Sequence, residues 1–329
     1  MIISVLMIGL LLCTIGTVSA HFTMVFPSDS EESVWDVAPE DYIADLGEVK
    51  TVYMMWGHPY EHILFDMMPA PTASVTRPDG TVEELNIEEI IVEGMDEDGN
   101  EGTFVAYKTS FIVDQMGDSV IAVEYDDAGE NLIDHTKAVI HCGEEMWTGW
   151  DAEVGQATEI IPYMRPYGME EGFVFAGKAL SDGNILAGAD VEVEIYHTLN
   201  EGIEVVESAE EKFPYDAPMV FTRLTKSNDA GDFMYTLDEP GIWFVGATME
   251  PETGRSVRGV FIVPVLEAFP TSQGASAELM EAVEEAKQIA QDAKQTAESS
   301  ADSPSTPGFE AIIAVFGLLA AVLIAARRE

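Results

Sequence analysis

The sequence predicts an all-β protein made of two β-sandwich modules, followed by a helical stalk and a C-terminal transmembrane or sorting helix. Three observations carry this prediction. Short, often alternating apolar segments separated by turn residues fill the chain up to about residue 266. Residues 276–300 are rich in Ala, Glu, Lys and Gln, as a helix requires. Residues 311–326 are all apolar and are followed by two arginines.

Composition limits the class of protein and of partner. The 329 residues include 60 acidic and 15 basic side chains, which gives a formal net charge of -45. Hydrophobic residues make up 47% of the chain, which is enough for a packed core and excludes disorder throughout. The charge argues against nucleic acid as a partner, because its phosphates would be repelled. The acidity fits either solubility in a salty medium or attraction of cations.

Residues 1–20 predict a cleaved signal peptide. They carry no charged side chain, and the apolar run Ile2–Leu12 is too short to span a membrane comfortably. The segment ends in Val18-Ser19-Ala20, which places small residues where signal peptidase requires them. Cleavage after Ala20 would make His21 the first residue of the mature chain.

The body divides into two modules and a crossing. Residues 21–145 are predicted to form the N-terminal β-sandwich, in which Pro78-Asp79-Gly80 makes a turn between strands. Residues 146–169 show no clear period and are interpreted as a crossing between domains. Residues 170–266 are predicted to form a second β-sandwich, similar to the small modules of transthyretin and carboxypeptidase-regulatory type. The expected strands of both modules include 49–56, 72–77, 103–108, 119–125, 173–175, 191–196 and 242–245.

The C-terminal part predicts attachment at the cell surface. Ser276 is a suitable N-cap for the helical stalk over residues 276–300. A Ser/Pro linker with the motif Pro307-Gly308-Phe309 occupies residues 301–309, and a transmembrane segment is predicted over 311–326. The order of linker, Pro-Gly-Phe, apolar run and basic end resembles the archaeal C-terminal sorting signal, which implies that a lipid anchor replaces the tail. Otherwise the segment is an ordinary membrane anchor with the arginines inside. Both alternatives place the body outside the cell membrane.

Three histidines are candidate metal ligands. A free amine at residue 21 and the imidazole of His21 can chelate one metal ion, and cleavage one residue earlier would offer an Ala-His start instead. His58 and His62 lie four residues apart in Gly57-His-Pro-Tyr-Glu-His62, where Pro59 favours a loop over a helix. Imidazole nitrogen suits nickel, copper and zinc.

The remaining chemistry-bearing residues are predicted to be structural. No comparable group of candidate ligands lies near the other three histidines in the sequence, which are His135, His141 and His197. Cys142 follows an apolar run typical of a buried strand. The acidic stretch that begins at Asp96 lacks the spacing of a calcium loop and is interpreted as a hairpin turn. No nucleotide-binding loop, nucleophile elbow or metalloprotease motif occurs, so no catalytic residue is predicted.

The order of these features resembles the NikM-like periplasmic component family of nickel and cobalt uptake, which is otherwise classed as a domain of unknown function. The segments that carry the resemblance are His21-Phe22, 57–62, 67–71, 154–168, 186–196, 228–235 and 240–243. Members look like extracytoplasmic metal-binding components built from two β modules. The resemblance implies that His21 and His58 are metal ligands, with His62 as an extra candidate. It also implies a membrane permease, which here would be a separate chain.

We therefore expect a non-enzymatic, surface-anchored protein that captures a nickel or cobalt ion for an uptake system. Two other classes stay open. One is a copper protein, because a terminal His with a second His forms a histidine brace that a chaperone or an oxidase could use. The other is a structural or adhesion protein that binds no metal.

Overall fold

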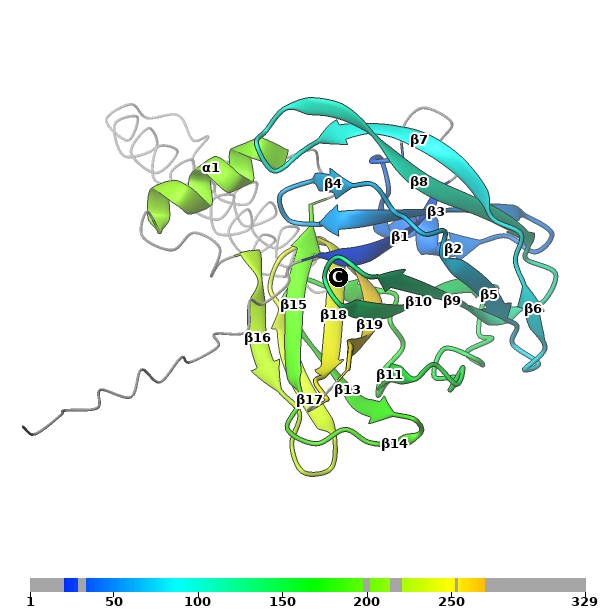
Figure 1. The fold of residues 1–329 in the computed structure, drawn as a ribbon. Helices are drawn as coiled ribbons and strands as arrows, with labels where there is room; N and C mark the ends of the chain where they lie inside the picture. Colours follow the sequence, from blue (N-terminus) through cyan, green and yellow to red (C-terminus); the bar gives the residue numbers. More distant parts are fainter. Residues whose placement is uncertain (1–20, 29–33, 198–201, 214–220, 252–253, 270–329) are drawn as a thin grey trace, which may run out of the picture. The chain divides into compact units, whose positions relative to one another are not determined.

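The computed structural model describes residues 21–28, 34–197, 202–213, 221–251 and 254–269, and within them the chain is nearly all β (Figure 1). The described part holds one α-helix, α1 (Gly202–Lys212), and one 3-10 helix, η1 (Pro39–Tyr42). No helix in these residues is long and apolar enough to cross a membrane. The predicted leader (1–20), stalk (276–300), linker (301–309) and transmembrane segment (311–326) lie outside the described residues.

The strands of the described residues form three sheets. The first sheet has five strands in the order β1-β3-β4-β7-β8, with β3 also paired to β8. Its members are β1 (Phe22–Ser28), β3 (Val49–His58), β4 (Ile63–Phe65), β7 (Glu88–Met95) and β8 (Glu101–Ile112).

The second sheet has ten strands and contains segments from both ends of the body. Its main path runs β16-β15-β18-β19-β10-β9-β5-β6, while β2 pairs with β10 and β12 with β19. Its members are β2 (Ile43–Ala44), β5 (Thr72–Thr76), β6 (Val82–Glu84), β9 (Gly117–Asp127), β10 (Leu132–Cys142), β12 (Met169–Glu170), β15 (Asp190–Tyr196), β16 (Arg223–Lys226), β18 (Gly241–Met249) and β19 (Ser256–Leu266).

The third sheet is the smallest, with four strands. β13 lies between β11 and β17 and also pairs with β14. Its members are β11 (Thr158–Pro162), β13 (Phe173–Ser181), β14 (Asn184–Ile185) and β17 (Asp232–Leu237).

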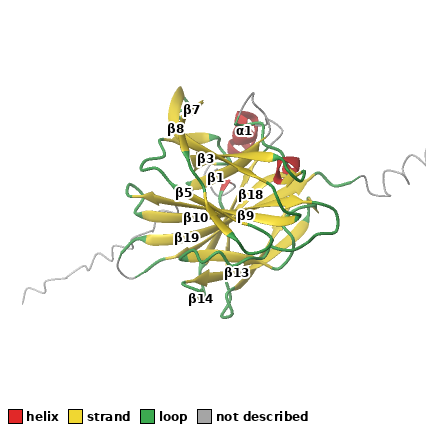
Figure 2. Cartoon of the chain, turned by 90° about the vertical axis from the view of Figure 1, so that its right-hand side faces the viewer, coloured by secondary structure: helices red, strands yellow, loops and turns green. Residues whose placement is uncertain are grey.

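The ten-stranded sheet lies between the other two (Figures 1 and 2), and its central strands contribute side chains to two cores, one on each face. Along β18, Ile242 and Phe244 belong to the core shared with the first sheet, whereas Trp243 and Val245 belong to the core shared with the third. Successive side chains of a strand point to opposite faces, so a strand covered on both sides is favoured by apolar residues at consecutive positions. This is why β18 reads as a continuous apolar run rather than an alternating one.

The structure differs from two self-contained sandwiches in this shared middle sheet. β10 of the predicted N-terminal module pairs in parallel with β19 of the predicted C-terminal module, from Leu132 opposite Ser256 to Lys137 opposite Phe261. Residues 146–169 are also not simply a crossing, because β11 already contributes to the third sheet. Periodicity reports which residues are buried, and it carries no information about which distant strand lies alongside. All strands lie in one compact unit that ends at Glu267.

Candidate metal centre

The register of β1 against β3 places His21 beside His58. The two strands are antiparallel, and Phe22 faces Gly57 at the end of their ladder. His21 is the residue before Phe22 and His58 the residue after Gly57, so one further step brings the two histidines together. Their ring centroids are 4.5 Å apart with an angle of 33° between the ring planes.

Aromatic side chains surround the two imidazoles. The ring of Phe65 meets His21 edge-on at a centroid distance of 4.4 Å and lies 5.6 Å from His58. Trp56 lies 5.6 Å from His21 on the same strand that carries His58. The histidine side chains are only 13% and 14% exposed. Both rings are therefore packed in place while they still reach solvent.

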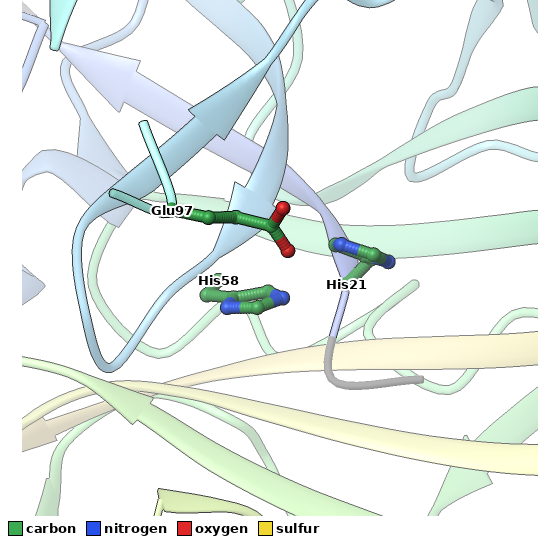
Figure 3. A group of neighbouring side chains, drawn as sticks. All are labelled: His21, His58 and Glu97. Carbon is green, nitrogen blue, oxygen red and sulfur yellow. The ribbon is translucent and has the colours of Figure 1, made fainter. Parts of the chain in front are cut away.

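Glu97 completes a group of three possible ligands (Figure 3). One ligand atom from each of His21, His58 and Glu97 lies within 4.8 Å of the other two. Glu97 comes from the turn between β7 and β8, which confirms the predicted hairpin. Glu97 is not among the predicted ligands, because a single carboxylate among 60 acidic residues carries no signal of its own.

The turn that carries Glu97 is held by its neighbour Asp96. A carboxylate oxygen of Asp96 accepts hydrogen bonds from the backbone N–H groups of Asp98 and Asn100, at 3.0 and 2.8 Å. These hydrogen bonds lower the pKa of Asp96, and the one from Asn100 has the largest effect. Gly99 adopts φ = +76°, which glycine accommodates without strain. The conformation of the turn is thus defined even though Glu97 itself is exposed.

His58 is oriented by Glu61 and by the close approach of β3 to β4. The Nδ1 atom of His58 lies 2.8 Å from Oε2 of Glu61. A carboxylate only accepts, so Nδ1 carries the hydrogen, and in the neutral ring Nε2 is then the nitrogen with a lone pair for a ligand. Gly57 permits the geometry, since a Cβ atom there would stand 1.9 Å from the carbonyl oxygen of Ile63.

His21 is held in the neutral form that a metal ion requires. Burial lowers the pKa of His21 to about 4, and the nearby charges of His58 and Arg258 act in the same direction. Its Nδ1 atom lies 3.6 Å from a carboxylate oxygen of Glu130. The imidazole is therefore a lone-pair donor at neutral pH rather than a cation that would repel a metal.

His62 lies outside this group of three. Its ring stacks on Trp35 at 5.9 Å and contacts Tyr196 at 4.6 Å. Burial, followed by the charge of His197, lowers the pKa of His62 to about 4. Its backbone has φ = +57°, an uncommon conformation for a residue with a side chain. The structure thus brings His21 and His58 together and packs His62 against Trp35 and Tyr196.

The other histidines of the described residues each contact a carboxylate elsewhere. The contacts are His135 with Glu124 at 3.2 Å, His141 with Asp118 at 2.7 Å and His197 with Glu239 at 3.0 Å. Cys142 is buried in β10, which confirms the prediction of a buried strand residue.

The donor set of the group is chemically suited to a divalent transition metal. Two imidazoles and one carboxylate combine nitrogen and oxygen ligands, which nickel, cobalt, zinc and Cu(II) accept. The set contains no thiolate or thioether, the ligands that favour Cu(I). If processing exposes the amine of residue 21, that group adds a further nitrogen donor at the same place.

Comparison with solved structures finds only distant likeness. An α-2-macroglobulin of Salmonella reacted with methylamine shares 12% identity at a TM-score of 0.22, with 76% of this chain and 15% of that chain covered. An Escherichia coli α-2-macroglobulin activated by porcine elastase shares 12% identity at a TM-score of 0.22, with 75% of this chain and 20% of that chain covered. A DUF4785 family protein of Legionella pneumophila shares 8% identity at a TM-score of 0.23, with 70% of this chain and 53% of that chain covered. The chain thus spans a fifth or less of the length of the macroglobulins.

Sequence comparison is more informative. No curated protein matches the chain. Residues 306–328 match the PGF-CTERM motif, a sorting signal of archaeal surface proteins, so the protein is a cell-surface protein sorted at its C-terminus. Residues 18–250 match the family described as Domain of unknown function (DUF4198), a match that spans most of the chain and includes the three grouped residues. The protein therefore belongs to the DUF4198 family.

Proposed function

We propose that the protein captures a divalent metal ion, nickel or cobalt, at the outer cell surface. The observation that carries the proposal is the group of His21, His58 and Glu97, whose ligand atoms lie within 4.8 Å of one another. His58 ends strand β3, His21 directly precedes the neighbouring strand β1, and Glu97 lies in a hairpin turn. A distribution of this kind can preorganise a site before the metal arrives.

The surrounding charge supports a cation as the cargo. Glu61 and Glu130 contact the two imidazoles, and the whole chain carries a net charge of -45. Such a field raises the local concentration of cations and speeds their arrival, although it contributes little selectivity. Selectivity rests on the imidazoles, because hard cations such as calcium prefer all-oxygen sites.

The proposed role is capture for uptake rather than catalysis. The metal is the cargo, and a separate permease chain would take it across the membrane. The C-terminal segment 311–326, or the lipid anchor that replaces it, would hold the protein near that permease. The resemblance to nickel and cobalt uptake components favours this role.

Metal binding by the mature chain tests the proposal. The leader is removed, the first residue is verified by mass spectrometry, and the affinities for Ni(II), Co(II), Cu(II) and Zn(II) are measured by isothermal titration calorimetry. We expect tight binding of Ni(II) or Co(II) with one ion per chain. A His58→Ala variant should lose more than about 100-fold in affinity, since even outer-shell partners are worth 10- to 100-fold.

A matched extension variant tests the amine of residue 21. Two extra residues placed before His21 leave both imidazoles in the chain but move the amine away. A large loss of affinity would identify the amine as a ligand. A strong preference for copper would favour the histidine brace instead, and the absence of tight binding for every metal would leave a structural surface protein as the better description.

A further inference from the structure

Arg258 of β19 reaches the backbone of the first residue of the described chain. Its guanidinium donates a hydrogen bond to the carbonyl oxygen of His21. The side chain is 1% exposed. The same group binds Asp134 of β10, with Nε to Oδ1 at 2.8 Å, and Glu192 of β15, with an Nη atom to Oε2 at 3.1 Å. Strands from both predicted modules therefore meet at the start of β1.

The two residues after His21 are held by the same cluster. The second carboxylate oxygen of Asp134 accepts a hydrogen bond from the backbone N–H of Thr23 at 2.9 Å. The guanidinium carbon of Arg258 lies 4.2 Å from the centre of the Phe22 ring, close enough for a cation–π contact. The cluster of Arg258, Asp134 and Glu192 thus contacts three consecutive residues of the chain.

Net stability is a poor explanation for such a cluster. Removing charges from water is costly, and replacing a buried ion pair by apolar side chains of similar volume is often neutral or stabilising. β1 also has a complete antiparallel ladder with β3, from Phe22 opposite Gly57 to Ser28 opposite Thr51. What the cluster adds to this ladder is a fixed position for the chain end.

Position matters greatly at this end of β1. A slip of one residue against β3 would turn each side chain of β1 to the opposite face of the sheet. His21 would then no longer stand beside His58. A terminal residue that only a ladder restrains also frays readily, because the first residues of a chain are poorly ordered unless they are tied down.

We propose that Arg258 is a positioning residue for the metal centre. By holding the carbonyl of His21, it fixes the register and the end of β1, so that the imidazole of His21 meets His58 and Glu97. The inference rests on the proposed function, and it assigns to the last strand of the second predicted module a role in a site built from the first.

The test compares a variant of Arg258 and a variant of its partner Glu192 with a control variant in another buried ion pair. Arg258→Lys keeps the charge but loses the planar fork that reaches Asp134, Glu192 and His21 together. Glu192→Gln keeps an oxygen that can accept from Arg258. The control is Lys137→Met, which removes the cation of another buried ion pair, Lys137 with Glu159 at 2.8 Å. Affinity for Ni(II), the visible spectrum of bound Co(II) and the thermal unfolding midpoint are measured for the mature chain.

Arg258→Lys is expected to lower the Ni(II) affinity by about 10- to 100-fold, as outer-shell changes do, and to alter the Co(II) spectrum while the protein still unfolds cooperatively. Glu192→Gln should remain within about 3-fold of the unmodified chain, because its hydrogen bond survives. Lys137→Met should leave affinity and spectrum unchanged even where it lowers the unfolding midpoint.

The outcomes separate the two proposals. If the unmodified mature chain binds no metal, the proposed function is wrong and the inference falls with it. If the unmodified chain binds metal and folded Arg258→Lys binds equally well with the same spectrum, the positioning role is wrong and the function stands. Should Arg258→Lys fail to fold, Asp134→Asn decides, since it keeps an acceptor for Thr23 but weakens the hold on Arg258. Unchanged affinity in that variant would overturn the inference.

Discussion

The carboxylate of Glu194 accepts a hydrogen bond from the backbone N–H of Tyr60 at 3.0 Å. Tyr60 lies in the loop that links His58 to His62, whereas Glu194 lies in β15. The hydroxyl of Thr222 donates a second hydrogen bond to the same carboxylate, also at 3.0 Å. The loop that carries the predicted ligands is thus fastened to the middle sheet by one buried acidic group.

This contact predicts a pH-dependent stability. Burial raises the pKa of Glu194 from 4.5 to about 8, so the folded protein keeps a proton that the unfolded chain releases above about 4.5. Stability should therefore fall as pH rises through this range, by roughly 1.4 kcal/mol per pH unit for one proton. Burial also raises the pKa of Asp118 and Glu192, which act in the same sense.

A Glu194→Gln variant isolates that contribution. Its amide is neutral at every pH and can still accept from Tyr60. We expect urea unfolding between about pH 5 and pH 8 to show a shallower loss of stability and a higher stability than the unmodified chain at the upper end. Exposed Glu101→Gln is the control, and equal slopes in all three proteins would contradict the prediction.

Glu97→Gln should weaken metal binding without affecting the fold. The side chain is exposed, and the turn around it is held by Asp96 rather than by Glu97. Loss of one anionic ligand should reduce affinity by about 10-fold or more, comparable with the loss of an outer-shell partner. Calorimetric titration with Ni(II) measures the effect. Asp98→Asn in the same turn removes an equal charge outside the group of three, and an equal loss there would show that only the general field matters.

Gly57→Ala should disrupt the approach of β3 to β4. The new methyl group would lie 1.9 Å from the carbonyl oxygen of Ile63. Because that atom belongs to the backbone, the backbone has to move to relieve the clash. We expect a destabilisation of about 1–3 kcal/mol, as for overpacked sites, together with weaker metal binding because His58 shifts. Gly102→Ala in β8 is the control, since its nearest neighbour is the ring of Phe104 at 3.3 Å, a side chain that can move. Urea unfolding and titration follow both variants, and a fully stable Gly57→Ala protein would refute the steric argument.

His62→Ala distinguishes a ligand from a packing residue. The imidazole stacks on Trp35 and contacts Tyr196, so its removal should cost about 2 kcal/mol of stability through lost packing. Metal affinity should stay near that of the unmodified chain, in contrast to His58→Ala. A joint loss of affinity in both variants would instead make His62 a third imidazole ligand, as the spacing in the loop suggests.

The sequence predicts the class of the fold well and its connections poorly. Apolar and β-branched residues bounded by turn signals identify the strands 49–56 and 119–125. The pairing of β10 with β19 depends on contacts between remote segments, which no local pattern encodes. The continuous apolar run of β18 is typical of a strand that is covered on both faces. Its short length and flanking turn residues distinguish it from a buried helix.

The same distinction applies to the candidate site. His21 and His58 stand out because imidazoles are rare in this chain and because each adjoins a recognisable boundary, a cleavage site or a strand end. Glu97 and Arg258 do not stand out, since one is an acid among 60 and the other lies in an unremarkable strand. Their roles depend on the three-dimensional meeting of β1, β19 and the β7–β8 turn, which only the folded chain provides.

The middle sheet joins strands from the two ends of the body, since β10 pairs with β19 at its centre, so no boundary between sheets separates the two halves of the sequence. A fragment ending near residue 145 would lose the neighbour of β10 and expose one complete face of that strand to water. The complementary fragment would present β19 with a bare edge, a template for unwanted association. We therefore expect neither half to fold alone, because each half would leave part of this shared sheet without its cover.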